Sequence, residues 1–223
     1  MRYARMQPAD QLVSIMHRIY TAGLTTMSGG NLSIRETNGD IWVTPGGIDK
    51  GSLTRHDMVC IHQDGKQSGF RKPTSELLFH QAIYKVRENV RAILHAHSPA
   101  LITFSILNCL PDVSLIPNAR IVCGKIGKAP YARMGSPELA DNIAAEFKKG
   151  YSVVLLENHG ICIGAETISQ AYLIFETLEF AARSELLARR LGTLNPLSET
   201  QIDLARTKRS EEHTSELQSR QVI

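Results

Sequence analysis

The stretch that most constrains the fold is an apolar run that ends in two histidines, Ala92-Ile-Leu-His-Ala-His-Ser-Pro99. The run predicts a buried strand over residues 92–96, and Ser98-Pro99 predicts a helix start, with serine as N-cap and proline in the first turn. Side chains two apart on a strand point to the same face. His95 and His97 can therefore direct two imidazoles at one point, which predicts a metal site at a strand end.

Two other segments carry further ligand types. The branched run Tyr151–Leu156 predicts a strand, and it is followed by Glu157-Asn-His-Gly160, which again places a histidine, His159, at a strand end. Glu76 falls in the first turn of a helix expected from Lys72 to about Arg87, where the helix dipole alone would account for a carboxylate. Three histidines and a carboxylate suit zinc or a similar divalent ion, although buried histidines that only form hydrogen bonds fit about as well.

The first third of the chain contains two glycine turns, Ser28-Gly-Gly-Asn-Leu-Ser33 and Thr44-Pro-Gly-Gly47. Turns of this kind present free backbone N–H groups and can hold an anion. For a lone glycine pair, a simple turn into a strand is the better explanation. The same helix start that carries Glu76 offers Thr74 or Ser75 as its N-cap. His80, four residues after Glu76, is expected to support the site or the core.

The remaining pattern alternates helices with short strands, as expected for an α/β protein. Helices are expected over residues 8–23, 136–149 and 169–191, and strands over residues 32–35, 40–43, 58–62, 120–123 and 161–164.

Composition excludes several classes of function. The chain has 223 residues and a formal charge of only +3, with basic residues spread along it, so nucleic-acid binding is not indicated. No apolar run is long enough to span a membrane, and the N-terminus lacks the apolar core of a secretory signal. The four cysteines form no CxxC pair and are expected to be buried thiols in a reducing cytoplasm.

We expect one domain over residues 1–195 and a C-terminal tail over residues 196–223. The last part of this tail, residues 209–223, is polar and lacks periodicity. It resembles the translated read-through of a sequencing adapter, so we expect it not to be native sequence and the native chain to be truncated near Lys208.

Several motifs occur together, in order, from about Pro8 to Arg190. In this combination the chain resembles the class II aldolase/adducin family, in particular the fuculose-phosphate aldolases. The motifs are the two glycine turns, Pro73-Thr-Ser-Glu76, His95-Ala-His97, Phe104-Ser-Ile-Leu-Asn108, Pro130-Tyr-Ala132 and Asn158-His-Gly160.

The resemblance implies a fold, a site and an activity. The fold would be a single three-layer α/β/α domain with a mostly antiparallel central sheet, in a homotetramer with its sites at subunit interfaces. His95, His97 and His159 would bind zinc or another divalent metal, and Glu76 would be both a fourth ligand and the general base. The residues expected around the substrate phosphate are Gly30, Asn31, Gly46, Gly47, Thr74 and Ser75.

The implied enzyme is a lyase that cleaves a C–C bond of a sugar phosphate or related sugar acid through a metal-stabilised enediolate. The chain departs from the family in two places. Gly46 replaces the usual hydroxyl residue of the second glycine turn, and the region Ser114–Pro117 lacks a proton-donor tyrosine, for which Tyr131 is one substitute. A second family tyrosine belongs to the C-terminal tail of a neighbouring subunit.

Two alternatives remain at this point. The same metal site serves dehydration, decarboxylation or epimerisation in other family members, although the 4-epimerases generally carry aspartate where this chain has Glu76. The other alternative is a non-catalytic interaction domain of the adducin type, which would be expected to have lost the metal ligands.

Overall fold

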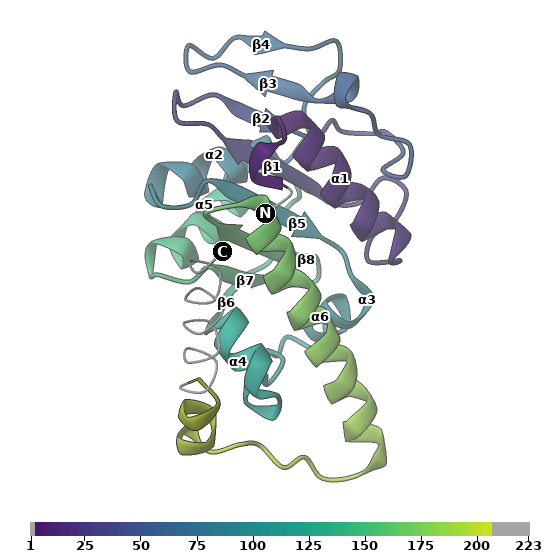
Figure 1. Ribbon diagram of the computed structural model, residues 1–223, viewed down its shortest axis with the longest axis vertical. Coiled ribbons are helices and arrows are strands. Elements are labelled where there is room, and N and C mark those ends of the chain that lie inside the picture. Colours follow the sequence, from purple (N-terminus) through teal and green to yellow (C-terminus); the bar gives the residue numbers. More distant parts are fainter. Residues whose placement is uncertain (1–2, 207–223) are drawn as a thin grey trace, which may run out of the picture.

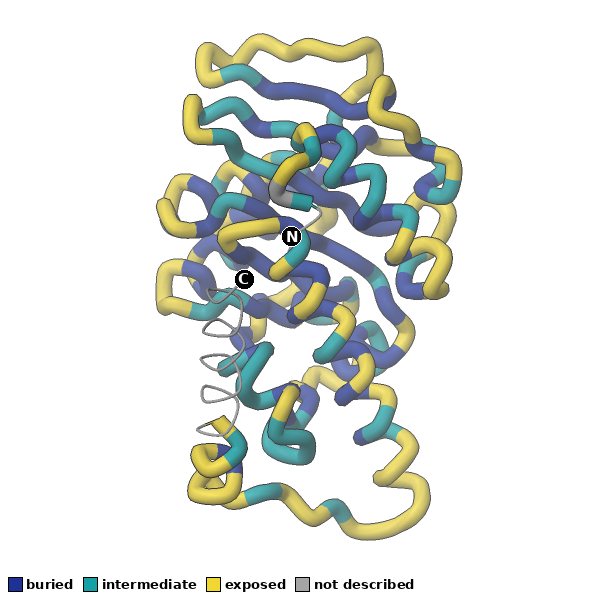
Figure 2. The backbone as a smooth tube through the Cα atoms, in the orientation of Figure 1, coloured by how far each residue is buried: buried dark blue, intermediate teal, exposed yellow. Residues whose placement is uncertain are grey.

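Strand β5 (Ala92–Ala96) lies inside an eight-stranded sheet and is buried along its whole length (Figures 1 and 2). The computed structural model describes residues 3–206. In these residues the strand order is β4-β3-β2-β1-β5-β8-β7-β6. The other strands are β1 (Asn31–Arg35), β2 (Ile41–Val43), β3 (Val59–Ile61), β4 (Gln67–Ser68), β6 (Ile126–Ala129), β7 (Val153–Leu156) and β8 (Gly160–Ala165).

Helices cover both faces of the sheet, because side chains of β5, β7 and β8 alternate between two apolar clusters. Leu94 of β5 packs with the helices on one face, and Ile93 packs with those on the other. The first face is covered by α1 (Pro8–Thr21), α3 (Pro99–Ile106), α4 (Pro117–Cys123) and α6 (Ile168–Leu191), and the second by α2 (Leu77–Val86) and α5 (Pro137–Lys148). Short 3-10 turns occupy Tyr3–Arg5, Arg55–Asp57 and Val113–Leu115.

The sheet is mixed: it contains a parallel pair, which corrects the sequence-based expectation for the central sheet. Strands β6 and β7 pair in parallel, with Ile126 opposite Val153, while the other neighbouring strands pair antiparallel. A parallel pair requires a long crossover connection. Helix α5, which lies between β6 and β7 in the chain, provides it.

Two local expectations are also wrong. Residues 120–123 are not a strand but the last turn of α4, which begins at Pro117, because proline at the first helical position fixes φ in the helical range. Helix α2 begins at Leu77, and Glu76 is its N-cap residue, without a side-chain cap. The hydroxyl of Thr74 instead accepts the backbone N–H of Glu76 at 3.3 Å.

The start of α3, directly after the two histidines, is fixed by a buried carboxylate. Ser98 is the N-cap residue as expected, but its side chain does not cap the helix. Glu179 of α6 accepts the Ser98 hydroxyl at 2.7 Å and the backbone N–H groups of Ala100 and Leu101 at 3.2 Å. These charge-assisted bonds tie the end of β5 to α6.

Residues 196–206 contact the sheet-bearing part of the chain. The backbone N–H of Leu197 donates to Ser114 at 3.1 Å, and Ile202 is fully buried. The segment expected to be non-native, residues 209–223, lies outside the described residues. Among residues 3–206, the helices are too short or too polar to cross a membrane.

Candidate metal centre

The two histidines of the opening stretch meet at the end of β5. His95 lies opposite Asn31 of β1 and Cys162 of β8, and its side chain is fully buried. Its Nδ1 lies 2.9 Å from the carbonyl oxygen of Ile161. Because a carbonyl can only accept, Nδ1 donates this hydrogen bond, and Nε2 is the nitrogen that faces the cluster.

His97 and His159 complete the imidazole group. The Nε2 atoms of His97 and His95 are 2.8 Å apart. His159 lies on the tight turn between β7 and β8, and its ring centroid is 4.8 Å from that of His95. Gly160 makes this approach possible, because a Cβ there would lie 2.6 Å from the carbonyl oxygen of Ala96 and 2.9 Å from His97 Cδ2.

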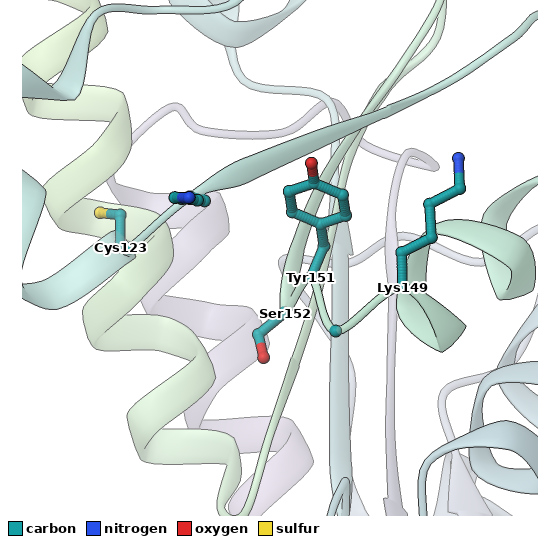
Figure 3. A pocket seen from close by; sticks show the side chains of 7 residues that line it. Cys123, Lys149, Tyr151 and Ser152 are labelled. Atoms are coloured by element: carbon teal, nitrogen blue, oxygen red, sulfur yellow. The ribbon is translucent and has the colours of Figure 1, made fainter.

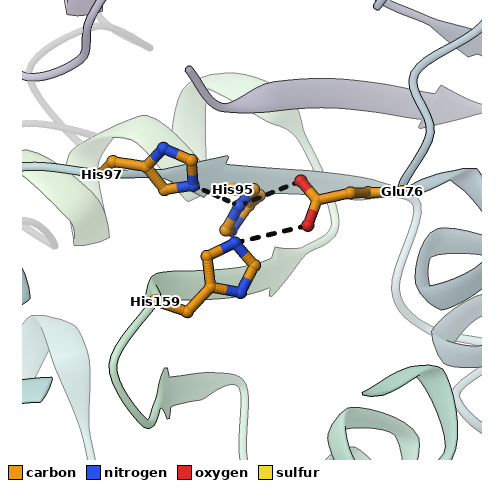
Figure 4. Close-up of side chains that lie close together, drawn as sticks. All are labelled: Glu76, His95, His97 and His159. Carbon is orange, nitrogen blue, oxygen red and sulfur yellow. Dashed lines mark hydrogen bonds and ion pairs between the residues drawn. The ribbon is translucent and has the colours of Figure 1, made fainter. Parts of the chain in front are cut away.

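The carboxylate of Glu76 faces two of these rings (Figure 4). Its Oε2 lies 3.2 Å from His95 Nε2, and its Oε1 lies 3.3 Å from His159 Nε2. One ligand atom from each of Glu76, His95, His97 and His159 falls within 4.8 Å of the others. The structure thus brings together all four residues that the sequence offered as metal ligands.

Burial and neighbouring charges set the protonation of the cluster. Burial and the adjacent histidines lower the pKa of His97 to about 3, and lower the pKa of His159 to about 4. Burial alone would raise the pKa of Glu76, but the facing imidazoles and the Asn31 amide hold it well below its usual range. Near neutral pH His97 and His159 are therefore neutral, and Glu76 is ionised.

The cluster fits a divalent cation. Glu76 Oε1 and both ring nitrogens of His159 are buried and have no hydrogen-bond partner within the described chain. Unpaired buried polar atoms are costly, and a cation beside Glu76 Oε1 and His159 Nε2 would satisfy both of these atoms. Three imidazoles and a carboxylate are a donor set that zinc and related divalent metals accept.

A hydrogen-bonded chain supports Glu76 from behind. Asn31 donates to Glu76 Oε2 at 2.8 Å, and its own Oδ1 accepts His80 Nε2–H at 2.5 Å. The remaining nitrogen of His80 lies 2.7 Å from the Ser33 hydroxyl, which lies 2.8 Å from the Tyr84 hydroxyl. His80, expected only to support the site or the core, therefore orients Glu76 through Asn31.

The glycine turns lie next to the cluster. Gly30 precedes Asn31 with φ of 70°, and a Cβ there would lie 2.7 Å from the carbonyl oxygen of His95. Gly46 closely approaches the segment that carries Thr74 and Ser75: a Cβ there would lie 3.3 Å from the Pro73 carbonyl oxygen and 3.6 Å from the Ser75 nitrogen. No neighbouring atom within 4 Å would contact a Cβ on Gly47. All six residues expected around a phosphate therefore belong to segments that adjoin Glu76 or His95.

Sequence reasoning missed a buried lysine behind the second glycine turn. Lys50 is 1% exposed, and its Nζ donates to the carbonyl oxygen of Pro45 at 2.8 Å. Burial lowers the pKa of Lys50 to about 8, so most molecules keep the charge at neutral pH. Buried lysines are rare, and the glycine turn that precedes Lys50 in the sequence gives no reason to expect a buried side chain there.

Two other features are not part of the cluster. Tyr131 is largely exposed, and its backbone N–H donates to Glu157 at 2.9 Å. A hollow of about 470 Å³ is lined by Cys123, Lys149, Tyr151, Ser152 and their neighbours (Figure 3). This hollow borders the residues that precede β7, whereas His159 follows its other end. It is therefore separate from the candidate metal centre.

The chain is similar to characterised enzymes over most of its length. The class II aldolase and adducin N-terminal domain matches residues 10–186. A 5-deoxy-D-ribulose 1-phosphate aldolase of Bacillus thuringiensis is 33% identical over 87% of this chain and 91% of its own length. An L-fuculose phosphate aldolase of Methanococcus maripaludis is 36% identical over 82% of this chain and 98% of its own.

Two further comparisons complete the pattern. A solved structure of an L-fuculose 1-phosphate aldolase superimposes with a TM-score of 0.80 and 32% identity, over 91% of this chain and 96% of that one. A 3-oxo-tetronate 4-phosphate decarboxylase of Haemophilus influenzae is 32% identical over 78% of this chain and 84% of its own. The chain therefore belongs to the class II aldolase and adducin family, as one of its aldolase-like enzymes.

Proposed function

We propose that this protein is a divalent-metal-dependent lyase that cleaves a C–C bond of a sugar phosphate. The observation that carries the proposal is the convergence of Glu76 with three imidazoles whose acceptor atoms need a cation. The relatives named aldolases point to a phosphorylated ketose as the substrate class.

His95, His97, His159 and Glu76 would hold the metal, and zinc suits this donor set. Such a cation acts as a Lewis acid on a carbonyl oxygen and stabilises negative charge that develops beside it. The carboxylate of Glu76 is ionised near neutral pH, so it can accept a proton from a substrate hydroxyl or carbon. Asn31 keeps this carboxylate in one orientation through its 2.8 Å hydrogen bond.

The substrate phosphate would bind between the two glycine turns and the segment before α2. Backbone N–H groups of Gly30, Gly46 and Gly47 and the hydroxyls of Thr74 and Ser75 are suitable donors, with Asn31 beside them. The buried ammonium of Lys50 adds positive charge behind Pro45. This positive charge would compensate in part for the hydrogen bond to phosphate that Gly46, which has no hydroxyl, cannot donate.

The test is metal removal followed by product analysis. Chelated protein should lose cleavage of L-fuculose 1-phosphate or 5-deoxy-D-ribulose 1-phosphate, and an added divalent ion should restore it. Cleavage of a 2-ketose 1-phosphate between its third and fourth carbons gives an aldehyde and a three-carbon ketose phosphate. Full turnover by metal-free protein, or no cleavage of any ketose phosphate in a broad panel, would refute the proposal.

Decarboxylation is the second candidate, favoured by the relative named 3-oxo-tetronate 4-phosphate decarboxylase. The same cation and carboxylate serve both reactions, because each passes through a carbanion next to a carbonyl. Release of CO₂ from a 3-oxo acid phosphate, without cleavage of any ketose phosphate, would select this reaction.

We also propose a homotetramer, which light scattering of the purified protein tests.

A further inference from the structure

We propose that Asp40, Cys60 and His62 form a second divalent-cation site, suited to zinc, at the edge of the sheet. The proposal is independent of the lyase function. One ligand atom from each of these residues lies within 4.8 Å of the others. The strand order places two strands between β3 and β5, so at normal strand spacing this site lies at least about 14 Å from the histidines of β5.

Strand register brings the three side chains to one face. Cys60 and His62 are two residues apart along β3 and its end, and therefore point the same way. Ile41 of β2 lies opposite Ile61, so the preceding residue, Asp40, lies beside His62. The ligands thus come from two adjacent backbone segments that the sheet already holds in position.

The distances match a tetrahedral zinc site. His62 Nδ1 lies 3.0 Å from Asp40 Oδ2 and 3.9 Å from Cys60 Sγ. Standard zinc–ligand bond lengths at tetrahedral angles give about 3.4 Å for the N–O pair and about 3.6 Å for the N–S pair. Movements of about 0.4 Å at most would bring both pairs to these separations, and side-chain rotations allow that.

Hydrogen bonds already orient the ligands. The backbone N–H of Gln63 donates to Asp40 Oδ1 at 3.1 Å, and Oδ2 faces His62 while it also accepts the Asn38 amide at 3.1 Å. The Ser68 hydroxyl lies 2.6 Å from His62 Nε2. When Nδ1 binds a cation, Nε2 carries the proton and donates it to Ser68, as the outer nitrogen of a metal-bound histidine usually does.

The site has both an entry path and a charge that favours a cation. Side chains of His62 and Asp40 are 36% and 18% exposed, so solvent reaches the ligands and water can take a fourth position. Cys60 is 2% exposed, and burial together with the carboxylates of Asp40 and Glu36 raises the pKa of its thiol to about 11. Binding replaces the thiol proton with the metal and releases one proton to solvent.

Cobalt(II) provides a spectroscopic test on the full-length protein. A thiolate bound to Co²⁺ gives an intense charge-transfer band in the near ultraviolet, which the imidazoles and carboxylate of the first centre cannot give. We expect this band to appear when Co²⁺ is titrated into the protein and to disappear when Zn²⁺ is added. We expect each chain to bind two metal ions. We also expect Cys60→Ser to remove the band and one metal. Cys123→Ser is the matched control, because it changes a buried thiol that is not grouped with other metal-binding side chains in the described residues. It should keep the band and both bound metal ions.

A second variant keeps the test decisive if Cys60→Ser does not fold. His62→Asn changes a partly exposed residue and should weaken Co²⁺ binding at this site at least tenfold, without altering the metal held by the first centre. Absence of the band at millimolar Co²⁺, or a band that survives in both Cys60→Ser and His62→Asn, would overturn the proposal.

Discussion

The Nε2 atoms of His95 and His97 lie 2.8 Å apart. His95 donates its Nδ1–H to the carbonyl of Ile161, so Nε2 is the nitrogen available to accept a hydrogen bond from His97 or to bind a cation. Either a proton on His97 or a shared cation must lie between the two rings. This geometry makes the pair a sensitive place to test the metal assignment.

We predict that His95→Ala loses the bound divalent ion and the lyase activity together. Removal of one imidazole leaves the metal with one ligand fewer, and loss of the cation should lower kcat/KM by about 10³-fold. Elemental analysis after dialysis and a cleavage assay measure the two losses. His56→Ala, at an exposed histidine outside the cluster, is the control; full metal content in His95→Ala would refute its role as a ligand.

The amide of Asn31 should tune the base. Asn31→Ala removes the N–H that stabilises the charged form of Glu76, so the pKa of Glu76 should rise. In a plot of kcat against pH, the fall in kcat on the acidic side should then move to higher pH. We expect kcat itself to be about tenfold lower. An unchanged profile with the same loss of activity would instead indicate that Asn31 acts only in substrate binding.

His80 should make the protein acid-sensitive. Burial, with the nearby His95, lowers its pKa to about 3, whereas an unfolded histidine titrates near 6.5. Both states are neutral above about pH 6.5, and below that the unfolded state alone takes up the proton. The free energy of unfolding should therefore fall by about 2 kcal/mol between pH 6.5 and pH 5 from this residue. Urea unfolding of His80→Gln should show a smaller fall over that range.

Gly160→Ala tests the close approach of β8 to β5. The added Cβ would lie 2.6 Å from the Ala96 carbonyl oxygen, so backbone must move and His97 with it. We expect a loss of about 1–3 kcal/mol in unfolding free energy and weaker metal binding. Gly192→Ala is the matched control, because no atom within 4 Å would contact a Cβ there. Equal stability of the two variants would contradict the prediction.

Lys50→Met tests the buried charge behind the second glycine turn. With the ammonium removed, KM for a phosphorylated substrate should rise several-fold, while bound metal stays unchanged. Lys85→Met, at an exposed lysine, controls for net charge. A KM that is unaffected in Lys50→Met would show that this lysine serves only to hold Pro45.

The sequence was sufficient for the features that depend on local pattern. Strand periodicity and helix-start residues located β5 and the position of His159, and motif order identified the family. The helical state of residues 120–123 was missed because a branched run alone does not distinguish a strand from a short helix. The roles of Glu179, Lys50 and the His80–Asn31–Glu76 chain depend on contacts between distant segments, which no local pattern encodes.

The sheet order has a consequence for how the chain acquires its metal. Strand β5 pairs with β1 on one side and β8 on the other, and the candidate ligands lie in β5 and directly after it, after β7, and just before α2. These segments meet only after distant parts of the chain have paired, a late step in folding for contacts of such high sequence separation. The cation at this centre should therefore bind after the fold has formed and should not start folding. It stabilises the folded state to a degree that depends on the free metal concentration.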